Sequence, residues 1–300
     1  MTQIQTTSTF TRPILWAAML LVGVSWGATT PLGKIAVSTG LHPIGITVWQ
    51  TLIMAVTLTI LVLVTGRRLP LTRNYLLLFL LLGLLGTALP HPLGYFAARH
   101  LPASVISIVL AAIPLATLMI ATLFGIDHPT PRRLFGLLLG FLAIALIVVP
   151  EGSLPDPELL VWIVLPILAV VSYAAENVCI DKIRLPQLDP LVTLCGLSWG
   201  AFFLTVPFLV LPGIWIDPFP LDDARLATLV LTGLHLSAYF GLIWLIEKAG
   251  AVFATQVSYV VTVSGVLIAI VFLGETASPM IGLATVLMLV GLAFVRPRRG

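Results

Sequence analysis

Ten long apolar runs make up most of this chain and restrict how it can fold. Nine of them carry no charged side chain, and the tenth contains a single acid, Glu176. A transmembrane helix needs about 20 apolar residues to cross about 30 Å of hydrocarbon. The runs cover residues 13–33, 43–66, 74–98, 103–125, 134–150, 159–180, 190–216, 226–246, 250–274 and 277–295. We therefore expect ten membrane-spanning helices.

The composition excludes a water-soluble globular domain. Hydrophobic residues make up 59% of the 300-residue chain and charged residues only 9%, against about 25% charged in soluble domains. Strands of membrane barrels are about 10 residues long and alternate polar with apolar side chains, and the runs here do neither. The first run is also too long for the core of a cleavable signal peptide. The sequence therefore predicts an all-α polytopic membrane protein.

Basic residues divide unevenly between the two sides that ten spans would create. Of the 15 Lys and Arg residues, 12 fall on the side of the termini, and only Lys34, Arg99 and Arg225 fall on the other. The positive-inside rule then places both termini in the cytoplasm, with the protein in the cytoplasmic (inner) membrane. Because the loops are short, any function must be built inside the membrane. The net charge of +3 reflects this sorting and does not indicate nucleic-acid binding.

The two halves of the chain share short patterns at a nearly constant offset. His42-Pro43 precedes Asp189-Pro190 by 147 residues, Ser25-Trp26-Gly27-Ala28 precedes Ser172-Tyr173-Ala174-Ala175 by 147, and His91-x-x-x-Tyr95-Phe96 precedes His235-x-x-x-Tyr239-Phe240 by 144. Each half would hold five spans, an odd number, so the halves would face opposite ways across the membrane. Inverted repeats of this kind are typical of secondary transporters. We predict two inverted five-helix repeats, at residues 13–150 and 158–297.

Short motifs also fall at defined places along the spans. They are Trp26-Gly27 followed by Lys34, Pro43, Leu101-Pro102-Ala103, Pro114, and Leu273-Gly274-Glu275 with Gly282. This pattern resembles the EamA-type transporters of the drug/metabolite transporter superfamily, and the resemblance covers essentially the whole chain. It implies export of amino acids, drugs or other small metabolites, often coupled to protons. The chain departs from the family at Gln50, where an arginine is common.

Polar side chains inside hydrocarbon are costly and mark candidate binding groups. His91 lies between Pro90 and Pro92, which remove backbone donors and free carbonyls. Tyr95 follows one turn later on the same face, and the same spacing recurs at His235 and Tyr239. We expect substrate to contact His91, Tyr95, His235, Tyr239, Tyr259, Gln256, Trp26 and Gln50. The alternative is that these side chains form hydrogen bonds between helices and do not contact substrate.

Four charged residues are candidates for proton coupling or gating: Glu176, Lys34, Arg99 and Glu247. A carboxylate inside a span can exchange a proton, which suits Glu176 for coupling. The alternatives are that Glu176 pairs with Lys182 and that the other three anchor their helices at the membrane surface.

Other classes of function remain open at this level. Gly-x-Ser-x-Gly occurs at residues 23–27 and 196–200, a pattern that marks a hydrolase nucleophile only on a strand–turn–helix elbow. An intramembrane hydrolase would use Ser198 and His235, but small residues at this spacing more often let helices pack closely. A flippase for a lipid-linked substrate and a receptor are further alternatives. No cofactor is implied, and the expected partners are a small-molecule substrate, membrane lipids and a second copy of the chain.

Overall fold

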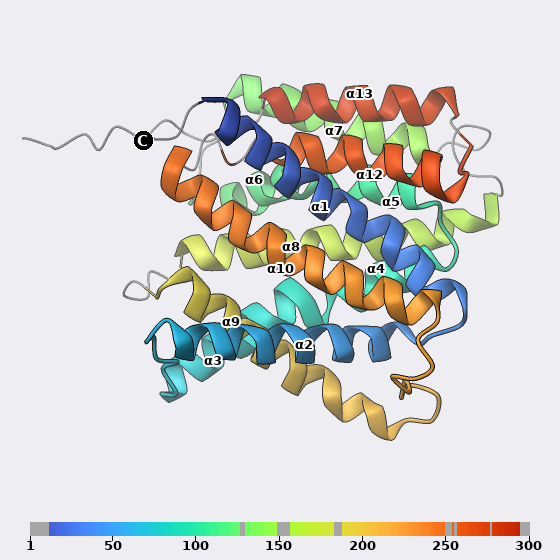
Figure 1. The fold of residues 1–300 in the computed structure, drawn as a ribbon. Coiled ribbons are helices and arrows are strands. Elements are labelled where there is room, and N and C mark those ends of the chain that lie inside the picture. Colours follow the sequence, from blue (N-terminus) through green and yellow to red (C-terminus); the bar gives the residue numbers. More distant parts are fainter. Residues whose placement is uncertain are drawn as a thin grey trace, which may run out of the picture.

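The computed structural model describes residues 12–126, 130–148, 157–182, 188–249, 254, 257–276 and 278–294. Within these residues every regular element is a helix (Figure 1). In the described part of the chain, seven segments are long and apolar enough to cross a membrane: Pro13–Ser38, Pro43–Val64, Arg73–Ala98, Ala103–Leu123, Glu158–Ile180, Pro190–Val210 and Asp223–Ile246. Val257–Leu273 and Pro279–Phe294 are shorter apolar helices. The prediction of an all-α membrane protein is confirmed to this extent.

The helices run roughly parallel to one another between two faces of the molecule (Figure 1). The terminal face, at which the first helix begins and the last one ends, is on the left in that view, and we call the other end the opposite face. The elements in order are α1 (Arg12–Ser38), α2 (Pro43–Val64), α3 (Arg73–Gly83), η1 (Leu84–Ala88), α4 (Pro90–Ala98), α5 (Ala103–Leu110), α6 (Ile113–Leu123), α7 (Pro131–Val148), η2 (Pro157–Ile163), α8 (Val164–Lys182), α9 (Pro190–Thr205), η3 (Val206–Val210), α10 (Asp223–Ala249), α12 (Val257–Leu273) and α13 (Pro279–Phe294).

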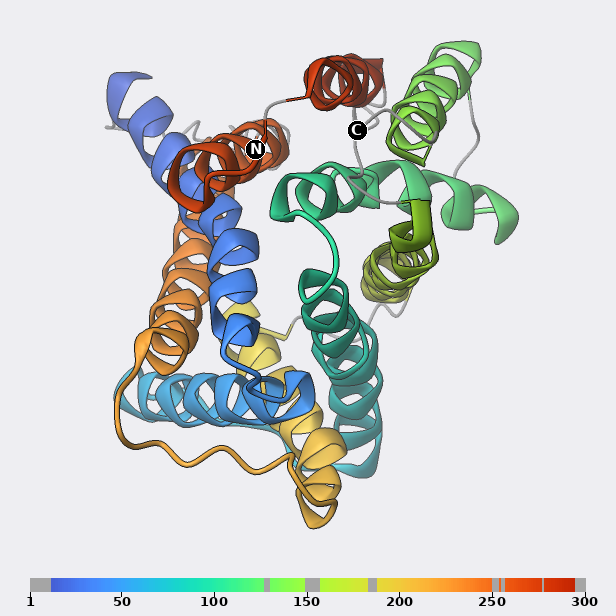
Figure 2. The ribbon, with the colours of Figure 1, turned by 90° about the vertical axis from the view of Figure 1, so that its right-hand side faces the viewer.

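Viewed along the helix axes, the molecule is divided into two sides (Figure 2). Helices α1, α10 and α12 pack together on one side, and α4, α5, α6 and α8 pack together on the other. The pair α2 and α9 joins the two sides at one end, and the pair α7 and α13 lies at the other end. The first side combines α1 with α10 and α12, and the second combines α4, α5 and α6 with α8. Each side therefore mixes helices from the first and second halves of the chain.

Proline begins many of these helices for a local reason. The first residue of a helix has no acceptor for its N–H, so proline loses nothing there and its fixed φ suits the helix. The side chains of His42 and Asp189 accept hydrogen bonds from the amides of Ile44 (3.3 Å) and Leu191 (2.8 Å), one residue beyond Pro43 and Pro190. The matched His-Pro and Asp-Pro pairs therefore start α2 and α9 in the same way, with a capped first turn.

One apolar run is longer than its helix. The run 190–216 is helical only as far as Val210, because Pro207 tightens the chain into η3 and Gly213 adopts a left-handed φ of 78°. Residues Ile214 and Ile216 then turn back and are buried. A Cβ on Gly45 would lie 2.2 Å from the Ile214 carbonyl oxygen, so this glycine lets α2 approach the returning chain.

Both Gly-x-Ser-x-Gly motifs lie where two helices approach closely. A Cβ on Gly27 would lie 2.0 Å from Ser264 Oγ of α12, and one on Gly23 would lie 2.4 Å from Val260 Cβ. A Cβ on Gly200 would lie 2.2 Å from the Phe79 carbonyl oxygen of α3. The motifs are therefore helix-packing faces, α1 on α12 and α9 on α3, as small residues at this spacing indicate.

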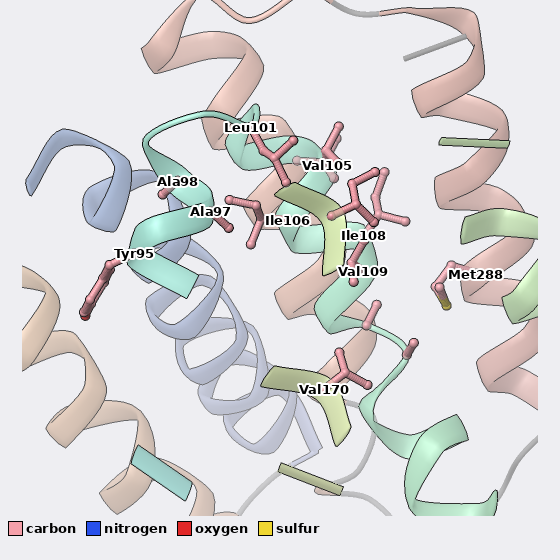
Figure 3. Packing of buried hydrophobic residues seen from close by; sticks show 14 of the residues in the cluster. Tyr95, Ala97, Ala98, Leu101, Val105, Ile106, Ile108, Val109, Val170 and Met288 are labelled. Atoms are coloured by element: carbon pink, nitrogen blue, oxygen red, sulfur yellow. The ribbon is translucent and has the colours of Figure 1, made fainter. Parts of the chain in front are cut away.

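The largest apolar cluster is centred on α5. Residues Leu101, Val105, Ile108 and Val109 are fully buried, and they pack with residues of α8 and α13. Figure 3 shows the Tyr95 ring on the side of α4 that is turned away from Val105 and Val109. Helix α4 therefore separates this apolar core from a second, polar set of side chains.

Candidate functional site

A buried glutamine links three helices through side-chain hydrogen bonds. Gln50 of α2 is fully buried, and its Oε1 accepts a hydrogen bond from the Tyr95 hydroxyl of α4 at 2.7 Å. The same oxygen lies 3.1 Å from His91 Nδ1. Since an amide oxygen only accepts, Nδ1 of His91 carries the hydrogen. The Nε2 atom of Gln50 lies 3.5 Å from His235 Nδ1 of α10.

Aromatic rings extend this group towards the terminal face. The rings of His91 and His235 lie 5.5 Å apart between centroids, and the His91 ring lies 6.4 Å from Tyr173 of α8. Tyr239 is one turn beyond His235 on α10 and makes an edge contact with Trp26 of α1 at 5.0 Å. Side chains of α1, α2, α4, α8 and α10 therefore meet here, and we call Trp26, Gln50, His91, Tyr95, Tyr173, His235 and Tyr239 the central cluster.

Glu176 reaches this cluster from α8 because the neighbouring span is distorted. The Leu84–Ala88 segment is a π-turn, in which each carbonyl bonds the amide five residues on. For Leu85 that residue is Pro90, which has no N–H. The Ser172 hydroxyl of α8 instead donates to the Leu85 carbonyl oxygen at 2.7 Å. This bond fixes α8 against the π-turn one helical turn before Glu176.

A glycine in the π-turn then makes room for the carboxylate. A Cβ on Gly86 would lie 2.1 Å from Glu176 Oε1. Any side chain at position 86 would therefore displace the acid. The Glu176 carboxylate lies within electrostatic range of the Tyr173 and Tyr239 hydroxyls, on the aromatic side of the central cluster.

At the opposite face, two charged side chains hold the turn between α4 and α5. The Lys34 ammonium of α1 donates to the carbonyl oxygens of Ala98 (3.2 Å) and Leu101 (2.6 Å). The Glu275 carboxylate, just beyond α12, accepts from the amides of Ala103 (2.6 Å) and Ser104 (3.0 Å) and from the Ser104 hydroxyl (2.6 Å). Cations at a helix C-terminus and anions at an N-terminus are both favourable.

The same turn is held from two further directions. The Arg99 guanidinium donates to the Leu41 carbonyl oxygen at 2.8 Å, in the loop between α1 and α2. The His100 ring stacks on Trp162 of η2, with centroids 3.6 Å apart and an angle of 10°. We call residues 98–104 with Lys34 and Glu275 the opposite-face latch. It ties α1 and α12 to α4, α5 and η2 at this end of the molecule.

The sequence was also compared with known families and proteins. The model of the EamA-like transporter family matches residues 12–149 and again residues 160–296. The chain belongs to the EamA-like transporter family. It is 26% identical over 288 residues to an uncharacterised transporter, YdfC, of Bacillus subtilis (strain 168), a match that covers 95% of this chain and 91% of the relative. The resemblance seen in the sequence motifs is therefore confirmed, and the chain is a membrane transporter.

A solved crystal structure has the same fold. It superposes with a TM-score of 0.64 at 18% sequence identity and covers 95% of this EamA-like transporter and 96% of the other chain. At that identity the similarity establishes the architecture alone. The two family matches in one chain give the two-repeat organisation.

The structure brings together most of the candidate binding residues of this EamA-like transporter. Trp26, Gln50, His91, Tyr95, His235 and Tyr239 all belong to the central cluster. Tyr259 is half-buried on α12 and packs against the large apolar cluster. Lys34 and Arg99 lie in the opposite-face latch. Gln256 and the side chains of Glu247 and Lys182 lie outside the described residues.

Sequence reasoning missed three residues of the site. Tyr173, Ser172 and Gly86 were not among the candidates, although they contact His91, the Leu85 carbonyl and Glu176. The offset of 147 residues pairs Tyr173 with Trp26 and Ser172 with Ser25, so the internal repeat carried a signal for the first two. Nothing in the sequence near Gly86 distinguishes it from a glycine that merely packs helices.

Proposed function

We propose that this EamA-like transporter exports small metabolites, such as amino acids or drugs, across the cytoplasmic membrane, with proton coupling and with both termini in the cytoplasm. The observation that carries this proposal is the central cluster, a hydrogen-bonded and aromatic group inside apolar spans. Polar groups placed there at such cost mark solute pathways. The two halves each supply a His-Tyr pair to it, at equivalent positions.

The proposal includes ten spans in two inverted repeats, at residues 13–150 and 158–297. Helices α7, α12 and α13 would join the seven longer segments to make ten. Five spans in each half reverse the direction of the second half. Transporters of this construction bind their solute near the middle of the bilayer, where the repeats meet.

The opposite-face latch supports a conformation that is closed at that end. Lys34, Glu275 and Arg99 close the space around the α4–α5 turn with direct hydrogen bonds. On the terminal side, Tyr173, Glu176, His235, Tyr239 and Trp26 each keep part of their surface uncovered, whereas Gln50, His91 and Tyr95 are buried. We infer that solute reaches the central cluster from the terminal face in this conformation.

Glu176 is our candidate for proton coupling. It is the one carboxylate in any of the ten apolar runs, and it lies beside the aromatic groups of the cluster. A carboxylate inside a span can exchange a proton with water in a pathway. Proton binding and solute binding would then compete for the same place.

Reconstituted protein tests the proposal. We would prepare sealed liposomes with an imposed pH gradient and follow the movement of amino acids, nucleosides and organic cations. Gradient-dependent movement of one class supports the proposal. In the double variant His91→Ala/His235→Ala this movement should stop, whereas Tyr75→Phe, at an aromatic residue near the start of α3, should leave it intact. Movement of no member by folded protein would contradict export of small solutes and favour the lipid-linked alternative.

A further inference from the structure

A carboxylate without a counter-charge in the described part of the chain, Glu176, lies beside the central cluster on its terminal side. Among the described residues Glu176 makes no ion pair, and the ammonium of Lys34 is held by carbonyl oxygens of the α4–α5 turn. The nearby histidines, His91 and His235, lie against the amide of Gln50. The one formal charge among these side chains is therefore a carboxylate, and a carboxylate inside a membrane protein favours a cation beside it.

The position of this charge is built by several contacts. Ser172 bonds the carbonyl that Pro90 leaves without a donor, and Gly86 leaves room for the carboxylate one turn later. These contacts come from α8 and from the neighbouring span that contains the π-turn, and the position of the Glu176 carboxylate depends on both. A carboxylate that only reached water at the end of a span would need neither contact.

Aromatic rings of α8, α10 and α1 lie on this side of the central cluster. Tyr173 is three residues before Glu176 on α8 and therefore shares its face. Tyr239 of α10 lies within electrostatic range of Glu176, and its ring contacts Trp26 of α1 with centroids 5.0 Å apart. Aromatic faces attract ammonium groups, and the attraction is stronger where water is excluded. A carboxylate with aromatic neighbours is suited to a cation that carries an apolar or aromatic body.

We propose that this site, Glu176 with Tyr173, Tyr239 and Trp26, selects organic monocations, namely protonated or quaternary amines with an aromatic or apolar body. This inference rests on the proposed function and narrows it, because it disfavours free amino acids. The carboxylate of an amino acid would need a cationic partner, and no described Lys or Arg contacts these four residues. Glu176 would instead repel it.

Three soluble compounds that differ mainly in charge test this selectivity. They are 2-phenylethylamine, phenylalanine and 3-phenylpropionate, a monocation, a zwitterion and an anion with the same ring. Equilibrium binding of each to the purified full-length protein in detergent would be measured at pH 7.5. We expect the amine to bind at least tenfold more tightly than phenylalanine and the anion to bind most weakly. Equal or reversed preference, or no binding of the amine, would overturn the proposal.

Matched variants separate the charge from the fold. Glu176→Gln should weaken amine binding at least tenfold, whereas Glu158→Gln, the same change near the other end of this span, should leave it unchanged. Tyr239→Phe should keep binding within about threefold, and Tyr239→Leu should lose at least fivefold, because the ring face attracts the cation. Unchanged amine affinity in both Glu176→Gln and Tyr239→Leu would show that the cation binds elsewhere.

The binding experiment is independent of transport. If the amine binds through Glu176 but does not move in liposomes, the site inference stands and the proposed export fails. If phenylalanine moves along a pH gradient and the amine does not bind, export stands and the cation site is wrong.

Discussion

Removal of the Glu275 carboxylate should open the opposite-face latch. The two oxygens of Glu275 accept three hydrogen bonds, from the Ala103 and Ser104 amides and the Ser104 hydroxyl, at 2.6–3.0 Å. Glu275→Ala leaves both amides at the start of α5 without an acceptor and leaves Lys34 without its nearby counter-charge. Glu275→Gln keeps one acceptor oxygen and removes the charge.

The magnitude follows from these bonds. A hydrogen bond to a charged group contributes about 1.5–3 kcal/mol, and loss of a helix N-cap costs about 0.5–2 kcal/mol. Because Glu275 is half-buried, water can replace part of what is lost. We therefore expect Glu275→Ala to weaken the closed form by about 2 kcal/mol, close to a 30-fold change in the closed-to-open ratio, since about 1.4 kcal/mol is tenfold. For Glu275→Gln we expect about half of that free energy.

Thiol labelling measures the opening. Ala98 is the last residue of α4 and the first residue of the latch, and it is buried, with 4% of its surface exposed. We would introduce Ala98→Cys, replace Cys179 and Cys195 by alanine, and follow the reaction of purified protein with a polar thiol reagent. The labelling rate should rise about 30-fold when Glu275→Ala is added, in proportion to the open population.

A matched acid on the same face serves as control. Among the described residues the Asp217 carboxylate accepts a hydrogen bond only from the nearby Trp215 indole, at 2.8 Å, so Asp217→Asn should leave labelling of Ala98→Cys unchanged. If Glu275→Ala also leaves the rate unchanged, while denatured protein labels fully, Glu275 does not hold this end closed and the reasoning is refuted.

Three further predictions concern glycine positions and pH. Gly86→Ala should weaken amine binding, because its Cβ would lie 2.1 Å from Glu176 Oε1 and displace the carboxylate, whereas Gly94→Ala, with open space around it, should not; equilibrium binding of the amine to both variants checks this. Gly27→Ala should destabilise the fold by about 1–3 kcal/mol, because the added methyl group would overpack α1 against α12. Gly233 has open space around it, so Gly233→Ala should stabilise α10 by about 0.5–1 kcal/mol. Chemical unfolding in mild detergent would compare the two variants. Burial and the neighbouring Arg99 lower the pKa of His42, so folding favours its neutral form and stability should fall as pH drops below about 6.5. His42→Asn keeps a capping side chain and should remove that part of the pH dependence, as thermal midpoints between pH 5 and 8 would show.

The helices themselves could be predicted because their signals are local. Apolar length marks a span wherever it occurs, and Pro43 and Pro190 mark helix starts through their missing N–H. The pairing of His91 with His235 also followed from the sequence, because both halves repeat one spacing. The run 190–216 was mispredicted at its end, since apolar residues that pack in a returning loop look like helix.

Interactions between distant residues could not be predicted in this way. Gln50 bonds residues 41 and 45 positions away and approaches one 185 positions away, and Glu275 caps a helix that begins 172 residues earlier. The π-turn also depends on a tertiary bond, because Ser172 satisfies the carbonyl that Pro90 leaves unpaired. Sequence patterns name the residue types at these positions but not which of them meet.

The internal repeat separates two kinds of residue in and beside the central cluster. His91 and Tyr95 have equivalents in His235 and Tyr239, so both halves contribute the same frame of rings. Two other positions break the equivalence: Gln50 corresponds to Leu197, and Glu176 corresponds to Thr29, at the offset of 147. The unmatched residues are the hydrogen-bonding centre and the charge. If the repeated rings shape the space and the unmatched groups decide what occupies it, exchange of Glu176 should change which compounds bind, whereas loss of a histidine should weaken all of them alike.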